Sequence, residues 1–122
     1  MSLIYLNIFI YTAFMYGNAP FLDQIVSLIV SIASPDQIIL FGSYARGDNT
    51  EKSDLDLLIV KKNLENGRKI IDTLYRSFFD NDIDIAVDLL TIDYDKYNKL
   101  KNEIGYIYKT ISKEGKVIYG TL

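Results

Sequence analysis

Apolar positions in the first half of the chain change from helical to strand-like spacing. From Leu22 to Val30 they recur every three or four residues. This spacing predicts an amphipathic helix that begins in the turn at Pro20 and ends at Ser34. The apolar run 37–41 is bounded by turn signals and predicts a buried strand.

The rest of the chain shows the same change of spacing, with polar turns between the segments. Strict alternation predicts strands, and apolar residues at i, i+4 and i+8 predict helices. The expected elements are a short helix from Tyr44, a strand over 54–60, a helix over 64–79, a strand over 83–90, a charged helix from Tyr94 that breaks near Gly105, and a short strand over 116–119.

This order of helices and strands predicts an α/β (α+β) fold. We expect a small mixed sheet of three or four strands with helices on one or both faces. The length of 122 residues allows one such domain. We assign residues 21–122 to the domain and residues 1–20 to an apolar N-terminal extension.

The extension has an unusual composition, since residues 1–22 contain no charged side chain. Its apolar part is too short to span a bilayer comfortably, and it lacks the basic start and cleavage site of a signal peptide. We therefore expect a cytoplasmic protein. The extension would pack on the domain or in a homo- or hetero-oligomeric interface. A membrane-associated segment is the minority interpretation.

The absence of histidine and cysteine removes several kinds of chemistry. Ser-His and Cys-His catalysis, imidazole zinc sites, thiolate sites and disulfides are all excluded. Carboxylates are the main metal ligands that remain, and sites made of oxygen ligands favour Mg²⁺ or Mn²⁺. The net charge of −3 differs from that of a dedicated nucleic-acid-binding protein, which usually carries a basic face.

One stretch combines a glycine-serine turn with two acidic residues on a strand. Gly42 allows close approach of the backbone to a phosphate, and Ser43 offers a hydroxyl at the start of a helix. Arg46, one helical turn later, could direct its guanidinium towards phosphate oxygens. Asp54 and Asp56 are two apart on a strand and therefore point the same way, which suits a pair of divalent ions.

A third carboxylate on the neighbouring strand would complete this site. Asp88 is the better candidate because it lies in the middle of the expected strand 83–90, where an unpaired charge would be costly. Asp84 has the same parity and is the second choice.

Each of these features has a simpler structural interpretation when it is taken alone. Gly42-Ser43 could be a strand-to-helix turn with a capping serine, and Asp54-x-Asp56 could be a polar strand face. Asp88 could cap a helix or pair with a lysine, and a structural ion pair is about as probable as a phosphate contact for Arg46. Their order and spacing together favour the functional interpretation.

With LFGSYARG at residues 40–47 and SDLDLL at residues 53–58, the chain resembles the minimal nucleotidyltransferases of the DNA polymerase β-like superfamily. The resemblance extends from about Phe21 to Tyr119 and includes VDLLT at residues 87–91. It implies a nucleotidyltransferase fold and transfer of AMP from ATP to a hydroxyl group.

The resemblance also implies roles for individual residues. Asp54, Asp56 and Asp88 would bind two Mg²⁺ ions, and Asp88 would help to deprotonate the acceptor. Gly42 and Ser43 would hold the β- and γ-phosphates. Small members of this family are typically antitoxins paired with a helical HEPN-domain toxin, and some are thought to add AMP to one of its tyrosines.

The chain departs from the family pattern in two ways. The apolar extension is not expected, and the acceptor-recognition domain of larger members is missing. A partner protein would then supply the acceptor or part of the site. The alternative is a non-catalytic module that binds nucleotide or partner and neutralises the partner by covering it.

Overall fold

The computed structural model describes Ala19 and residues 21–120. The turn at Pro20 and nearly all of the extension, residues 1–18 and 20, lie outside the described residues. No helix in the described part of the chain is long and apolar enough to cross a membrane.

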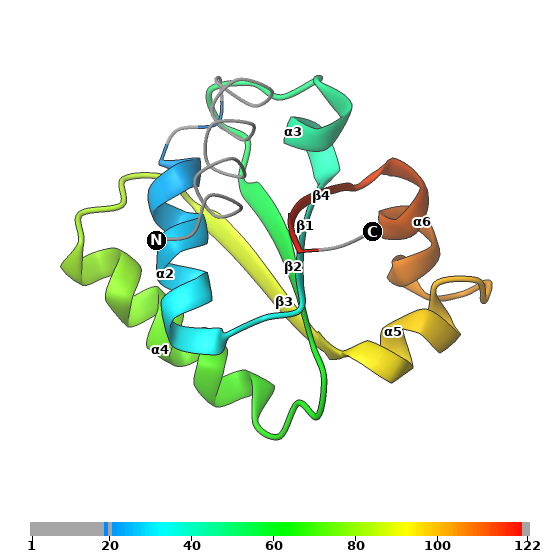
Figure 1. Cartoon of the computed structure of the whole chain (residues 1–122). Coiled ribbons are helices and arrows are strands. Elements are labelled where there is room, and N and C mark those ends of the chain that lie inside the picture. The colour runs from blue at the N-terminus through cyan, green and yellow to red at the C-terminus, as the bar shows by residue number, and fades with distance from the viewer. Residues whose placement is uncertain (1–18, 20, 121–122) are drawn as a thin grey trace.

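The described residues form a mixed α/β domain, as predicted. A four-stranded sheet carries helices on both faces, and the strand-helix order follows the sequence pattern (Figure 1). The elements are α2 (Leu22–Ala33), β1 (Gln37–Phe41), α3 (Gly42–Arg46), β2 (Leu55–Lys61), α4 (Gly67–Asp80), β3 (Val87–Asp93), α5 (Tyr94–Leu100), α6 (Ile107–Glu114) and β4 (Lys116–Gly120).

The sheet has the strand order β3-β2-β1-β4. Strand β1 is antiparallel to both of its neighbours, β2 and β4. Strands β2 and β3 are parallel, and α4 makes the crossover between them. Two consecutive strands that carry acidic residues therefore start at the same end of the sheet.

Two apolar clusters cover the two faces of the sheet. Alternate β2 residues, including Leu55 and Leu57, are buried with α2 and α4 on one face. The intervening residues Leu58 and Val60 are buried with α5 and α6 on the other. Figure 1 shows the two helix pairs on opposite sides of the sheet. Because side chains alternate along a strand, Asp56 belongs to the face of α5 and α6.

Several predicted boundaries are wrong. Helix α3 begins at Gly42, two residues before the predicted start at Tyr44, and strand β3 ends at Asp93, three residues after Leu90. Strand β3 begins at Val87, not Ile83, because Leu55 at the start of β2 pairs with Val87 and residues 83–86 pair with no strand in the described part of the chain. Ile83 still packs against the core, so its apolar spacing extends beyond the ladder. Strand β2 itself starts at Leu55, one residue after Asp54.

Helix α4 starts three residues later than predicted. The side chain of Asn66 accepts a hydrogen bond from the Lys69 backbone N–H, and this cap sets the start at Gly67. The break near Gly105 is confirmed, since the structure has two helices, α5 and α6, on either side of residues 101–106.

Candidate functional site

Asp56 and Asp88 lie opposite each other on the parallel strands β2 and β3. Neighbouring strands are about 4.8 Å apart, so paired residues project side by side from the same face. Asp56 is half-buried and Asp88 is exposed. The face that they share is covered farther along the strands by α5 and α6, so the two carboxylates lie at its open end.

Asp54 adds a third carboxylate just before β2 begins. Three effects raise the pKa of Asp56, namely its burial, the charge of Asp88 and the charge of Asp54. The positive charge of Arg46 acts in the opposite direction. Each of these charges therefore acts on the Asp56 carboxyl group, as expected for groups that share one site.

The turn at Gly42 lies directly against the Asp56 carboxylate. Phe41, the residue before it, pairs with Asp56 across β1 and β2. Gly42 has φ +72°, and a Cβ built there would overlap the Oδ2 atom of Asp56. The backbone conformation therefore favours glycine, and any larger residue would also have to displace the Asp56 carboxylate. The predicted Gly42-Ser43 turn and the acidic strand are brought together.

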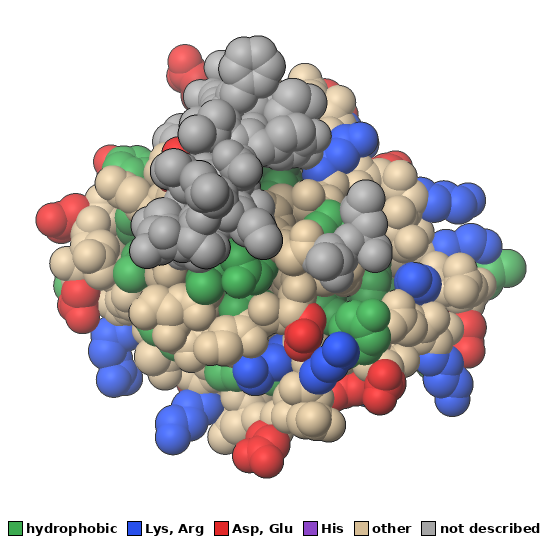
Figure 2. Space-filling model, in the orientation of Figure 1, with side chains coloured by type: hydrophobic (Ala, Val, Ile, Leu, Met, Phe, Trp, Pro, Cys, Tyr) green, Lys and Arg blue, Asp and Glu red, His purple; other side chains and the backbone are tan. Residues whose placement is uncertain are grey.

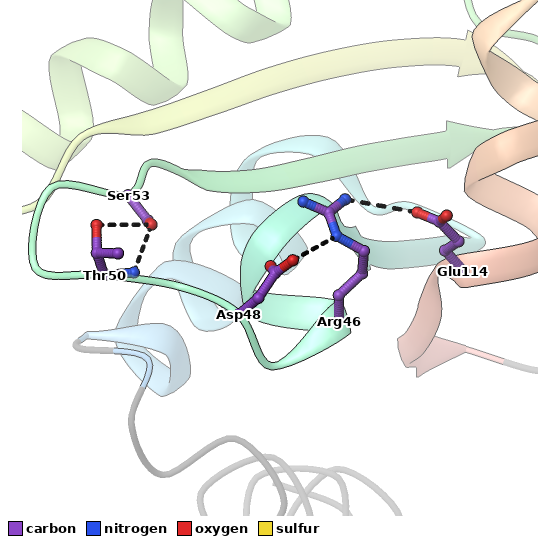
Figure 3. A network of polar contacts seen from close by, with 5 residues as sticks. All are labelled: Arg46, Asp48, Thr50, Ser53 and Glu114. Atoms are coloured by element: carbon purple, nitrogen blue, oxygen red, sulfur yellow. Dashed lines mark hydrogen bonds and ion pairs between the residues drawn. The ribbon is translucent and has the colours of Figure 1, made fainter.

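Arg46 forms two ion pairs. The sequence had left open whether this residue makes a structural ion pair or contacts phosphate. Its Nε lies 3.2 Å from Oδ2 of Asp48, and its Nη1 lies 3.5 Å from Oε2 of Glu114 (Figure 3). The second contact joins α3 to the end of α6. The structural ion pair is therefore present, and a contact of Arg46 with phosphate stays a prediction.

A compact turn, which the sequence interpretation missed, leads into Asp54. The Thr50 N–H donates to Ser53 Oγ at 2.8 Å, and the Ser53 N–H donates to the Thr50 carbonyl at 3.1 Å. Figure 3 shows this turn beside α3. A hydroxyl residue three positions after another is the local signal that could have revealed it.

Tyr75 of α4 was also missed. Its hydroxyl accepts a hydrogen bond from the Leu89 backbone N–H at 3.1 Å. Strand β3 is an edge of the sheet, and this bond satisfies one outward donor next to Asp88. No pattern of residue spacing in the sequence predicts a hydrogen bond between this helix residue and the Leu89 amide.

A hollow of about 840 Å³ opens beside the starts of β2 and β3. It is lined by residues 49–53, residues 83–86 and Tyr44. Its volume falls within the usual range for small-molecule sites. Asp84, the second choice for the third carboxylate, lines this hollow and lies outside β3, without a strand partner opposite Asp54 or Asp56.

The carboxylates of this site suit a divalent ion that is held in part by a bound substrate. Within residues 21–120, no three acidic side chains close around one point as in an enclosed metal centre. Mg²⁺ is usually held by one or two carboxylates together with substrate phosphates. The facing carboxylates of Asp56 and Asp88, whose mutual repulsion a cation would relieve, suit that arrangement.

Comparison with solved structures identifies the fold. One chain of a crystal structure of a toxin–antitoxin with AMP-PNP superposes with a TM-score of 0.58 and 24% identity. The match covers 81% of this chain and 73% of that one. A mutant of the MntA-HpeT toxin–antitoxin gives a TM-score of 0.59 and 21% identity, with the same shares covered. At these identities the likeness concerns the fold alone.

Sequence comparison extends this likeness to a family. The chain is 35% identical over 95 residues to "Putative protein adenylyltransferase MJ0604" of Methanocaldococcus jannaschii. The match covers 68% of this chain and 77% of the relative. The model of the nucleotidyltransferase domain matches residues 22–118, which include the Gly42 turn and all three carboxylates. The chain therefore belongs to the nucleotidyltransferase domain family and is a nucleotidyltransferase.

Proposed function

We propose that this nucleotidyltransferase transfers AMP from ATP to a tyrosine hydroxyl of a HEPN-type toxin and so acts as its antitoxin. The observation that carries the proposal is the facing pair Asp56 and Asp88 with the Gly42 turn against it. Such a site combines a place for phosphates with carboxylates for divalent ions. The relative named "Putative protein adenylyltransferase MJ0604" and the toxin–antitoxin neighbours support the choice of a protein acceptor.

Three carboxylates would hold the ions in this proposal. Asp54, Asp56 and Asp88 would bind two Mg²⁺ ions together with the phosphates of ATP. When bound, the ions supply neutralisation of the charge on the phosphates. Gly42 and Ser43 would hold the β- and γ-phosphates, with the Ser43 hydroxyl and the amide groups of α3 donating hydrogen bonds to them.

Asp88 has the role of positioning and deprotonating the acceptor. Its exposed carboxylate would accept the proton of the attacking hydroxyl, whose oxygen forms the new bond to the α-phosphorus. The bond between the α-phosphorus and the bridging oxygen breaks, and pyrophosphate leaves. The protein's contribution is mainly the placement of charges rather than a covalent intermediate.

Label transfer tests this function. The chain is incubated with Mg²⁺ and α-labelled ATP, with and without a purified HEPN-type partner, beside the Asp54→Ala/Asp56→Ala variant. We expect label on the partner with the parent chain and a loss of at least about a hundredfold with the variant. Mass spectrometry then locates the modified residue, and its replacement by phenylalanine removes the label.

A charge-matched control separates site chemistry from net charge. The Asp72→Ala/Asp80→Ala variant removes two exposed carboxylates from α4, which lies on the other face of the sheet. It should label the partner as the parent does. If the partner forms a stable complex but takes up no label from any form, the chain is instead a binding module that neutralises by covering.

A further inference from the structure

The loop between α5 and α6 exposes an apolar tip. Ile104 is 86% exposed, and Tyr106 and Ile107 are each about half exposed. Gly105 lies between them with φ +97°, and nothing lies within 4 Å of the place where its Cβ would be. This tip therefore exposes three large apolar side chains within four residues.

The stem that carries this tip is anchored. Leu100 at the end of α5 and Ile111 in α6 are both buried in the core cluster on that face. The rings of Tyr97 and Tyr108 contact each other edge to face, with centroids 6.2 Å apart. The two ends of the loop that carries the tip are therefore fixed before any partner binds, which lowers the entropy lost on association.

The segments on either side of the tip are rich in lysine. Residues 94–116 contain six lysines and three acidic residues, whereas the rest of the chain has seven basic and thirteen acidic residues. None of these lysines forms an ion pair with a described residue. Figure 2 shows Lys and Arg side chains on the right-hand side, where α5 and α6 lie. Residues 102–108 themselves contain no lysine or arginine. We call residues 104–107, together with the lysines of the flanking segments 94–101 and 109–116, the lysine-rimmed patch.

We propose that the lysine-rimmed patch is the docking surface for the acceptor protein, and that this partner offers an apolar pocket edged by Asp and Glu. An apolar centre with a charged border is the usual anatomy of a protein–protein interface. A nucleic acid would require cations at the centre of the surface, and the chain as a whole is acidic. A second copy paired through the same patch would bring lysines against lysines.

The patch and the candidate site lie on the same face of the sheet. Helix α6 starts at Ile107 in the patch and ends at Glu114, which pairs with Arg46. Eight helical residues span only about 12 Å. An interface of standard size, about 800 Å² on each partner, would reach from the patch to the open end where Asp56 and Asp88 lie. This assignment of the occupant rests on the proposed function.

Binding of the HEPN-type partner to matched variants tests the proposal. Ile104→Asp places a charge at the tip, and Phe79→Asp places the same charge on an equally bare residue, 83% exposed, on α4. We expect Ile104→Asp to raise the Kd for the partner and the KM for it in label transfer about tenfold or more. The KM for ATP and the melting temperature should not change, and Phe79→Asp should bind as the parent does.

The lysines are tested by salt. The Lys99→Glu/Lys109→Glu variant should bind more weakly than the parent and lose most of the parent's weakening between about 50 and 500 mM NaCl. Parent-like binding by Ile104→Asp, or displacement of the partner by RNA in competition, would overturn the proposal. If the parent binds but transfers no label, only the proposed function fails, because Kd still reports on the patch.

Discussion

Asp56 and Asp88 occupy opposite positions on two parallel strands, and the charge of Asp88 raises the pKa of Asp56. Parallel strands that start at the same end of a sheet place such residues side by side without a long loop. Like charges at this spacing oppose folding unless a cation binds between them. The same pair therefore links the stability of the domain to its chemistry.

Replacing Asp56 by asparagine should make the domain more stable and inactive. Asp56→Asn removes the repulsion with Asp88 and Asp54 while it keeps the shape of the side chain. Without Mg²⁺ we expect a melting temperature about 2–6 °C above that of the parent. Label transfer should fall at least about a hundredfold.

Addition of Mg²⁺ with ATP to the same two proteins tests the metal assignment. A ligand at ten times its Kd stabilises a folded protein by about 1.4 kcal/mol. The parent should gain this stability and Asp56→Asn should gain much less. An equal gain in both proteins would show that Asp56 does not hold the ion.

Replacement of Gly42 by alanine should cost both stability and activity. A positive φ costs an alanine about 1 kcal/mol, and the new Cβ must also displace the Asp56 carboxylate. We expect a total loss of about 2–4 kcal/mol in urea unfolding, together with loss of label transfer.

Gly47 provides the matched control for Gly42. It also has a positive φ, +83°, but a Cβ there would meet nothing within 4 Å. Gly47→Ala should therefore lose about 1 kcal/mol and keep its activity. Equal losses in the two variants would mean that the contact with Asp56 adds nothing beyond backbone strain.

The sequence was sufficient to predict the elements and the parity of the acidic residues, because both depend on local spacing. The face of the strand on which Asp88 lies could be predicted from alternation within that strand. The choice between Asp88 and Asp84 depends on register, since only the pairing of Leu55 with Val87 decides where β3 begins. Contacts between distant segments, such as the Tyr75 hydroxyl with the Leu89 amide, have no local signal.

Arg46 should affect ATP binding more than stability if it contacts phosphate. Its two ion pairs are exposed, and such pairs contribute about 0–1 kcal/mol. Arg46→Ala should raise the KM for ATP about tenfold, since hydrogen bonds to charged groups contribute more than 1 kcal/mol. Glu114→Gln, which removes one of its partners, should leave that KM within about twofold. A lower melting temperature with an unchanged KM would make Arg46 purely structural.

Asp23 should give the domain a measurable dependence on pH. Its Oδ1 atom, in the first turn of α2, is buried and has no hydrogen-bond partner among the residues that the structure describes. Burial raises the pKa of this carboxyl above its usual value of 3.8. The folded protein therefore binds this proton more tightly than the unfolded chain does. The associated stability is complete below about pH 4 and is lost as the pH rises through the folded pKa.

The neutral variant Asp23→Asn should remove this part of the pH dependence. The difference in melting temperature between variant and parent should grow in favour of the variant from about pH 3.5 upwards and become constant above the folded pKa. Asp72→Asn, on the exposed face of α4, controls for the loss of one negative charge. A difference that shrinks with rising pH would mean that the ionised Asp23 is stabilised by the N-terminus of α2 more than burial disfavours it.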